Sequence, residues 1–141
     1  MPVGMTHSFP LRVYYEDTDL AGIVYYANYL RFIERARTEW VRGLGVDQVR
    51  LRDEAGIVFA VRRVEADYLS PARFDDALVV HTVPVEVTGA RIVLAQDVLR
   101  GEAVLFSSRV TLVALGPDGR ARRLPAGMVA DLRRGAETKP R

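Results

Sequence analysis

The sequence predicts an α+β domain in which an antiparallel sheet of about five strands wraps around one long helix. Between Tyr29 and Leu44, apolar residues recur at spacings of four, three, four and four, which is typical of a single buried helical stripe. After this helix, several segments alternate apolar and polar residues and are joined by links of hairpin length. Short links favour antiparallel strands, because parallel strands need long crossovers.

The first predicted strand leads directly into the helix region. The residues that share its apolar face are Phe9, Leu11, Val13 and Tyr15. Tyr15 is therefore expected to point toward the core. The long helix is expected to stop at Gly43 or Gly45, because glycine adopts the left-handed conformation that ends helices. Residues 21–27 offer no conventional capping side chain, so the sequence does not define where the helix begins.

The remaining elements follow in order along the chain. They are a short helix capped by Asp47 and ending near Gly56, strands over 57–68, 79–87, 91–100 and 104–114, and a final helix beginning at Pro125. Pro84 favours a bulge or an edge in the second of these strands. Two tight turns are predicted, one at Gly101-Glu102 and one in the GPDG segment at residues 116–119.

Length and composition limit the architecture to one domain. A chain of 141 residues that is 49% apolar suits a single domain over residues 1–133, followed by a tail over 134–141 that we expect to be flexible. No apolar run is long enough to cross a bilayer, and the first nine residues lack the features of a signal peptide, so a cytoplasmic protein without membrane insertion is expected. Exposed sheet edges predict a homo-oligomer.

Charge and residue usage exclude several classes of function. A net charge of +2 is too small to favour a nucleic-acid partner. The chain has no cysteine and only two histidines without metal-ligand spacing, so we expect neither a metal site nor a cofactor. Lys139 is the only lysine and Asn28 the only asparagine, a bias that either a thermophilic source or a GC-rich genome would produce.

A carboxylate-based hydrolysis is the chemistry that the remaining residues favour. Asp17 and Asp19 precede Gly22 and then the long helix, an order that places a carboxylate near unpaired N–H groups at a helix start. No serine lies in a GxSxG motif. A thioester suits such a site, because a thiolate leaves without being protonated. Either aspartate could instead only shape the turn or cap the helix.

The segment YYEDTDLAGIVYYANYLRFIERARTEW at residues 14–40 resembles the signature of the hot-dog-fold acyl-CoA thioesterases. It is similar to the 4-hydroxybenzoyl-CoA thioesterase class and to its YbgC-type relatives. The similarity continues through DYLSPARFDD at residues 67–76 and, more weakly, to about Leu132. The resemblance implies the hot-dog fold, hydrolysis of an acyl-CoA with a short-chain or aromatic acyl group, and a homodimer or homotetramer with active sites at the subunit interface.

The resemblance also implies site residues. Asp19 matches the catalytic carboxylate, acting as nucleophile or general base, and Tyr15 matches a tyrosine that accompanies it. Tyr26 stands where many YbgC-type members have a histidine, and its backbone N–H matches the donor to the thioester oxygen. The residues expected to bind substrate are Gly22 and Val24 within the motif and, for the CoA phosphates, the arginines Arg62, Arg63 and Arg91, with Arg122 and Arg123 as further candidates.

Three residues outside this set keep open alternatives. Glu34 is either a solvated partner of neighbouring arginines or a helix-borne carboxylate of the site. Arg37, at the edge of the apolar stripe, either pairs with a buried carboxylate or lies in an interface. His81 is expected to be a core residue.

A second class of function is an alternative to the enzyme. A non-catalytic binding or assembly protein for acyl-CoA or an acyl carrier would use the same fold and the same groove.

Overall fold

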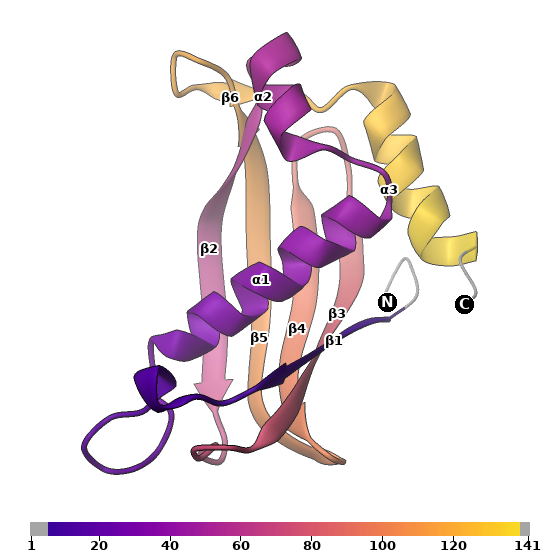
Figure 1. The fold of residues 1–141 in the computed structure, drawn as a ribbon. Helices are drawn as coiled ribbons and strands as arrows, with labels where there is room; N and C mark the ends of the chain where they lie inside the picture. Colours follow the sequence, from indigo (N-terminus) through magenta and orange to yellow (C-terminus); the bar gives the residue numbers. More distant parts are fainter. Residues whose placement is uncertain (1–5, 139–141) are drawn as a thin grey trace.

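The predicted sheet and central helix are both present in the computed structural model of the chain, which describes the backbone of residues 6–138 and the side chains through Arg133 (Figure 1). The elements in chain order are β1 (His7–Arg12), the 3-10 turn η1 (Tyr15–Asp17), α1 (Asn28–Gly43), α2 (Gln48–Ala55), β2 (Val58–Tyr68), β3 (Ala77–Val87), β4 (Ile92–Arg100), β5 (Ala103–Leu115), β6 (Ala121–Arg122) and α3 (Ala126–Thr138).

All strand pairings in the sheet are antiparallel, in the order β1-β3-β4-β5-β2, and the two-residue β6 pairs with β5. The sequence did not predict β6, because two residues carry no readable alternation. β2 follows α2 in the chain, yet it pairs with β5 at the far edge of the sheet. The sheet therefore has two unlike edges, the six-residue β1 and the eleven-residue β2.

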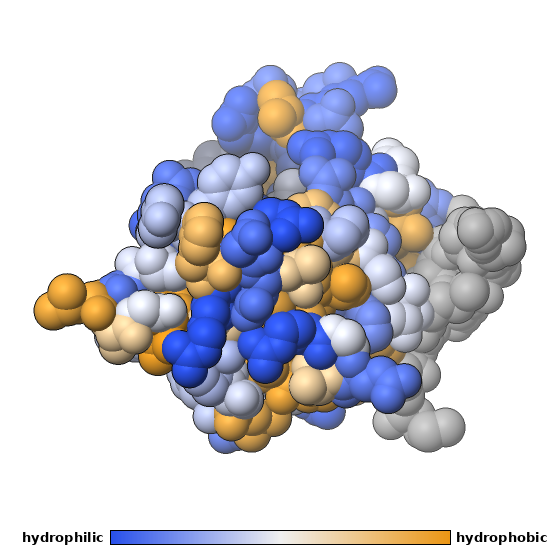
Figure 2. Space-filling view, turned by 60° about the horizontal axis from the view of Figure 1, so that its bottom comes forward, coloured by the Kyte–Doolittle hydropathy of each residue, from blue (hydrophilic) through white to orange (hydrophobic). Residues whose placement is uncertain are grey.

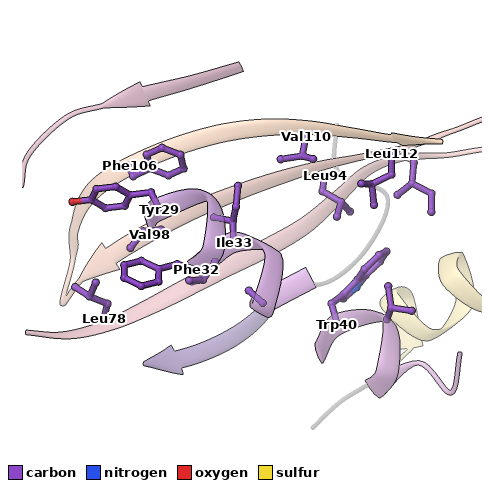
Figure 3. Packing of buried hydrophobic residues seen from close by; sticks show 14 of the residues in the cluster. Tyr29, Phe32, Ile33, Trp40, Leu78, Leu94, Val98, Phe106, Val110 and Leu112 are labelled. Carbon is purple, nitrogen blue, oxygen red and sulfur yellow. The ribbon is translucent and has the colours of Figure 1, made fainter. Parts of the chain in front are cut away.

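The helix α1 lies across one face of the sheet and supplies the centre of the core (Figure 1). Its predicted stripe is confirmed, since Tyr29, Ile33, Ala36 and Trp40 are all buried. Figure 3 shows α1 side chains packed against strand residues such as Phe106. The helix packs mainly over β3, β1 and β4, whereas β2 is contacted by the short helix α2. The helix begins after Ala27 without a side-chain cap, as the sequence suggested.

The predicted short helix is also confirmed, and so is the alternation of β5 from Phe106 onward, although Val104 is exposed and Leu105 is buried, the reverse of what the alternation predicted. Asp47 caps α2 by accepting a hydrogen bond of 3.0 Å from the N–H of Arg50, and Gly56 ends the helix in the left-handed conformation. In β5, the alternate residues Phe106, Val110 and Leu112 are buried, whereas Arg109 is exposed.

The prediction that His81 is a core residue was wrong. In β3 the core-facing residues are Leu78, Val80 and Thr82, and His81 lies on the opposite, half-buried face. The pairing register shifts between Pro84 and Glu86, at the bulge that Pro84 predicted. The misassignment arose because both faces of this inner strand carry apolar residues, so alternation did not distinguish the core face.

The orientation predicted for Tyr15 was also wrong. The strand ends at Arg12, and the backbone turns into η1, so the alternation that buries Val13 does not continue to Tyr15. The Tyr15 side chain is 76% exposed and stacks on Phe74, with ring centroids 4.2 Å apart.

At the C-terminus, α3 begins after Pro125 as predicted and continues to Thr138. The expected flexible tail began at residue 134, so its first five residues are helical, and residues 139–141 lie outside the described part of the chain. Within residues 6–138, no helix has both the length and the apolarity needed to cross a bilayer.

Candidate active site

A hollow of about 300 Å³ opens beside the start of α1, where the motif at residues 14–40 meets the end of β2. Its wall comes from three segments: the approach to the helix, the first turn of α1, and the end of β2 with the loop that follows. The lining residues are Ile23, Val24, Tyr26, Tyr29, Tyr68, Leu69, Ser70 and Pro71. Most of these side chains are apolar or aromatic, so the hollow suits an uncharged group.

The backbone at this helix start presents unpaired N–H donors. The N–H of Asn28 donates to the carbonyl of Tyr25 at 2.8 Å, and that of Leu30 donates to Ala27 at 3.1 Å. Within residues 6–138, the N–H groups of Tyr26 and Ala27 donate to no acceptor. The aligned peptide dipoles of α1 add partial positive charge at the same place. This end of the helix is therefore suited to stabilise a developing oxyanion.

Tyr68 fixes the peptide group next to these donors. Its hydroxyl donates a hydrogen bond of 2.9 Å to the carbonyl oxygen of Tyr26, and its ring packs edge to face on Tyr29 and Phe106. Burial among these rings raises the pKa of Tyr68, with smaller contributions from Tyr26 and Tyr29, which keeps its hydroxyl a donor. Residue-level reasoning missed Tyr68, although it lies in the DYLSPARFDD segment that carried part of the resemblance.

Asp17 has the structural role that the sequence left open. It is only 4% exposed, and its two carboxylate oxygens accept hydrogen bonds from the N–H of Tyr14 at 2.8 Å and from Nδ2 of Asn28 at 2.7 Å. Its carbonyl accepts from the N–H of Tyr25. One buried residue thus ties η1 and the segment before α1 to the first residue of the helix.

Asp19 lies in a loop that projects from the domain beside the helix start (Figure 1). Its Oδ1 accepts a hydrogen bond of 2.9 Å from the N–H of Ala21, and its backbone N–H donates to the carbonyl of Ile23. Asp19 is exposed, and Leu20 next to it is fully exposed. Figure 2 shows this end of the molecule, where small hydrophobic patches alternate with hydrophilic residues and a hydrophobic projection stands at the left edge.

Within a single chain, the Asp19 carboxylate and the helix start are near in sequence but form no hydrogen bond with each other. Within residues 6–138, the carboxylate has one hydrogen-bond donor, the N–H of Ala21. The base of the loop is nevertheless fixed, because Thr18 pairs with Val24, and Val24 donates from its N–H to the carbonyl of Ala72 at 2.8 Å. The loop is thus anchored at its base and leaves the carboxylate accessible.

The other predicted binding residues are only partly brought together. Val24 lines the hollow, and Gly22 occupies the tip of the projecting loop with φ at +81°, a conformation that favours glycine. The predicted phosphate-binding arginines lie elsewhere. Arg63 pairs with Glu65 along β2, and Arg91 pairs with Glu86 at the β3–β4 turn, at the other end of the sheet from the hollow (Figure 1).

Arg62 sits at the bulge of β2, where the register with β5 shifts between Val61 and Arg63. Arg122 and Arg123 lie against Gly116 and Gly89, in the region of the β5–β6 connection and the β3–β4 turn. None of these arginines lines the hollow at the start of α1. Within residues 6–138, no group of three or more histidine or acidic side chains is arranged to hold a metal ion.

Comparison with known proteins places this geometry in a family. Residues 21–107 match the family model of the thioesterase superfamily. The acyl-CoA thioesterase YbgC of Haemophilus influenzae is 44% identical over 108 residues, covering 77% of this chain and 79% of that protein. The acyl-CoA thioester hydrolase YbgC of Escherichia coli O157:H7 is 39% identical over 127 residues, covering 89% and 94%.

Solved structures agree with the fold. A probable thioesterase from Bartonella henselae superposes with a TM-score of 0.80 at 37% identity, covering 85% of this chain and 99% of that one. A mutant 4-hydroxybenzoyl-CoA thioesterase complexed with 4-hydroxybenzoyl-CoA gives 0.83 at 24% identity, covering 90% and 98%. The predicted hot-dog fold and the predicted resemblance are thereby confirmed, and the chain belongs to the thioesterase superfamily.

Proposed function

We propose that the chain is an acyl-CoA thioesterase that hydrolyses the thioester of a short-chain or aromatic acyl-CoA to the free acid and CoA. The observation that carries the proposal is the unpaired N–H of Tyr26, a residue that lines an apolar hollow at the start of α1. The names of the YbgC relatives, which are acyl-CoA thioesterases, support the choice of substrate class.

The proposed oxyanion donor is the N–H of Tyr26. A thioester carbonyl placed in the hollow would accept a hydrogen bond from this N–H, and the dipole of α1 would stabilise the negative charge that develops on the oxygen. Because the donor is a backbone group, the tyrosine side chain is not required for this role. The histidine side chain that many YbgC-type members have at this position is then not required for thioester activation in this chain.

Asp19 is the proposed catalytic carboxylate. In one route it attacks the carbonyl carbon, the C–S bond breaks, CoA leaves as the thiolate, and water then hydrolyses the mixed anhydride. In the other route Asp19 accepts a proton from the attacking water. One of its oxygens accepts from Ala21, and the other has no donor within residues 6–138. Tyr15 precedes this loop in the sequence and stacks on Phe74. We propose that it helps to position the loop and takes no part in the chemistry.

We propose that the working enzyme is a homo-oligomer, either a dimer or a tetramer. Within residues 6–138, the eleven-residue strand β2 has a paired neighbour on one side only, and it exposes Val58, Val61 and Val64. A long edge with unpaired backbone groups is a template for pairing with another strand, and a second copy supplies an identical one. Covering this edge would also exclude water from the region beside the hollow, which strengthens electrostatic catalysis. The mass in solution, measured by light scattering, should be that of two or four chains.

The arginines Arg62, Arg63 and Arg91 are proposed to meet the CoA phosphates in the assembled oligomer, since none lines the hollow of its own chain. Gly22 and Val24 are proposed to shape the path by which the thioester enters the site.

A cytoplasmic location and a thermophilic source remain predictions from composition. They bear on where the enzyme works and leave its chemistry unchanged.

The test is hydrolysis of a panel of short, long and aromatic acyl-CoAs, followed by the thiol released. Turnover of at least one substrate by the native chain, lost in Asp19→Asn, is the expected result. If the chain binds acyl-CoAs but hydrolyses none of them, it is a binding protein that uses the same groove. If Asp19→Asn retains native turnover, thioester hydrolysis stands but this carboxylate has no part in it.

A further inference from the structure

A half-buried arginine faces a second, smaller pocket further along α1. Arg37, Glu34 and Val41 from the helix and Phe59 and Val61 from β2 line this pocket, which has a volume of about 160 Å³. It lies on the side of α1 that faces β2, away from the β1 side of the sheet. A guanidinium carries a charge, so one that is held in a partly buried pocket needs hydrogen-bond acceptors there.

The acceptors available to Arg37 are few. Its Nη1 donates a long hydrogen bond of 3.4 Å to Oε1 of Gln96, and within residues 6–138 it forms no ion pair with a carboxylate. Glu34, on the same flank of the helix, accepts a hydrogen bond from the Thr38 hydroxyl at 3.0 Å. Burial lowers the pKa of Arg37 and the nearby charge of Glu34 opposes this, yet arginine stays protonated in proteins.

A fully buried amide orients this guanidinium. Gln96 is 0% exposed, and its Nε2 donates to the carbonyl of Ile33 and to the hydroxyl of Thr82, both at 2.9 Å. With both amide hydrogens used, Oε1 can only face Arg37. The interaction uses one donor of the guanidinium, and Arg37 lines the pocket with donors to spare. Such a planar, oriented group is suited to a carboxylate.

A track of side chains, apolar except for Glu34, lies between this pocket and the hollow at the helix start. On α1, Leu30, Glu34 and Arg37 follow one another at spacings of four and three, so they line one flank of the helix. Leu30 is exposed on that flank. Arg37 is nine residues after Asn28, which places it about 14 Å along the helix from the first turn.

The facing strand presents apolar side chains over the same distance. The bulge between Val61 and Arg63 shifts the alternation by one residue, so Phe59 and Val61 share a face with Val64 and Tyr68. Tyr68 lines the first hollow, Val64 is exposed between them, and Val61 lines the second pocket. The track therefore runs from the proposed thioester site to the guanidinium of Arg37.

We propose that this track binds the acyl chain and that Arg37 binds a carboxylate at its far end, so that medium-length acyl groups ending in a carboxylate are preferred over methyl-ended groups of equal length. This inference rests on the proposed thioesterase function and specifies its substrate class. A charge-assisted hydrogen bond in a partly buried site corresponds to a preference of about tenfold to a hundredfold.

The test compares kcat/KM for two pairs of substrates. The long pair is decanoyl-CoA and the mono-CoA thioester of decanedioic acid, and the short pair is butyryl-CoA and succinyl-CoA. The native enzyme should prefer the carboxyl-ended member of the long pair by about tenfold or more and show a much smaller preference within the short pair, which does not reach Arg37. Arg37→Met should abolish the preference within the long pair.

Arg35→Met is the matched control, because Arg35 is an exposed arginine on the same helix that does not line the pocket. It should retain the native preference. Failure to hydrolyse any of the four substrates would overturn the thioesterase assignment itself. Hydrolysis with no preference for the carboxyl-ended long substrate, or a preference that survives Arg37→Met, would overturn only the role of Arg37. Equal losses on both long substrates, accompanied by a change in oligomeric mass, would overturn it too and assign Arg37 to the subunit interface.

Discussion

The hydroxyl of Tyr68, at the end of β2, donates a hydrogen bond of 2.9 Å to the carbonyl oxygen of Tyr26, just before α1. These residues are 42 positions apart in the chain, and the bond joins the edge strand to the peptide region that holds the proposed oxyanion donor. Tyr68 is therefore a positioning residue. It acts on the thioester through the orientation of the Tyr26 backbone.

Tyr68→Phe should lower kcat by about threefold to tenfold, because it removes one hydrogen bond worth about 1 kcal/mol while keeping the ring that packs on Tyr29. KM should change less than kcat, since the apolar wall is preserved. Steady-state kinetics on one acyl-CoA checks both values. Tyr14→Phe is the control, because Tyr14 is exposed and does not line the hollow. A fall in melting temperature with kcat unchanged would assign Tyr68 to stability alone.

The backbone role of Tyr26 predicts that proline and phenylalanine have different effects at this position. Tyr26→Pro removes the N–H, and loss of one oxyanion donor lowers kcat by about 100-fold to 1000-fold. Proline is tolerated near a helix start, so the fold should persist, as circular dichroism would show. Tyr26→Phe keeps the N–H and should lose far less activity. If the phenylalanine variant were as inactive as the proline variant, the phenol would be the acting group.

Substitutions at Asp17 and Asp19 should have different effects, the first on stability and the second on catalysis. Asp17→Ala leaves the N–H of Tyr14 and the Asn28 amide without their buried acceptor, which should cost about 2 to 4 kcal/mol in the free energy of unfolding. Urea denaturation measures this loss. A cost below about 0.5 kcal/mol would contradict the structural role of Asp17.

Asp19→Asn should leave the free energy of unfolding nearly unchanged, because an asparagine oxygen can still accept the hydrogen bond from the N–H of Ala21. Its turnover should nevertheless fall by about 100-fold or more, since the amide neither attacks the thioester nor accepts a proton from water. Kinetics and denaturation on the same preparation distinguish this variant from Asp17→Ala. Equal effects of the two substitutions on stability would contradict the division of roles.

The sequence predicted the elements that local patterns encode. Four features depend on residues close in the chain and are present: the stripe of α1, the cap at Asp47, the turn at Gly101 and the alternation of β5 from Phe106 onward. The order of the strands was not predicted, because the pairing of β2 with β5 depends on long-range packing. The orientation of Tyr15 failed for a related reason, since the 3-10 turn interrupts the strand period.

The site was predicted in part for similar reasons. The motif identified Asp19 and Tyr26 as candidates, but it could not show that Asp17 is the buried, hydrogen-bonded aspartate of the two. Tyr68 and Gln96 lie on strands distant from the motif, and only the folded sheet brings them to α1. Residues that position other residues carry no local signature, so single-sequence reasoning misses them.

The loop before β3, which borders the hollow, should lose stability at low pH through Asp76. Its carboxylate accepts hydrogen bonds of 2.8 Å from the N–H of Arg73 and from the guanidinium of Arg100. Burial acts to raise the pKa of Asp76, but these two donors and the charge of Arg100 outweigh it, and the net pKa is lowered. Because the folded-state pKa is depressed, the stabilisation is present above the unfolded value of 3.8 and is lost as pH falls through the folded value.

Asp76→Asn should therefore lower the free energy of unfolding by about 1 kcal/mol near neutral pH, with the difference from the native chain shrinking as the pH falls below 3.8. Urea denaturation at several pH values measures the difference. Asp75→Asn is the matched control, because the Asp75 side chain is 68% exposed and its ion pair with Arg12 should contribute little. A difference for Asp76→Asn that stays constant across the whole pH range would show that its hydrogen bonds stabilise the loop independently of charge.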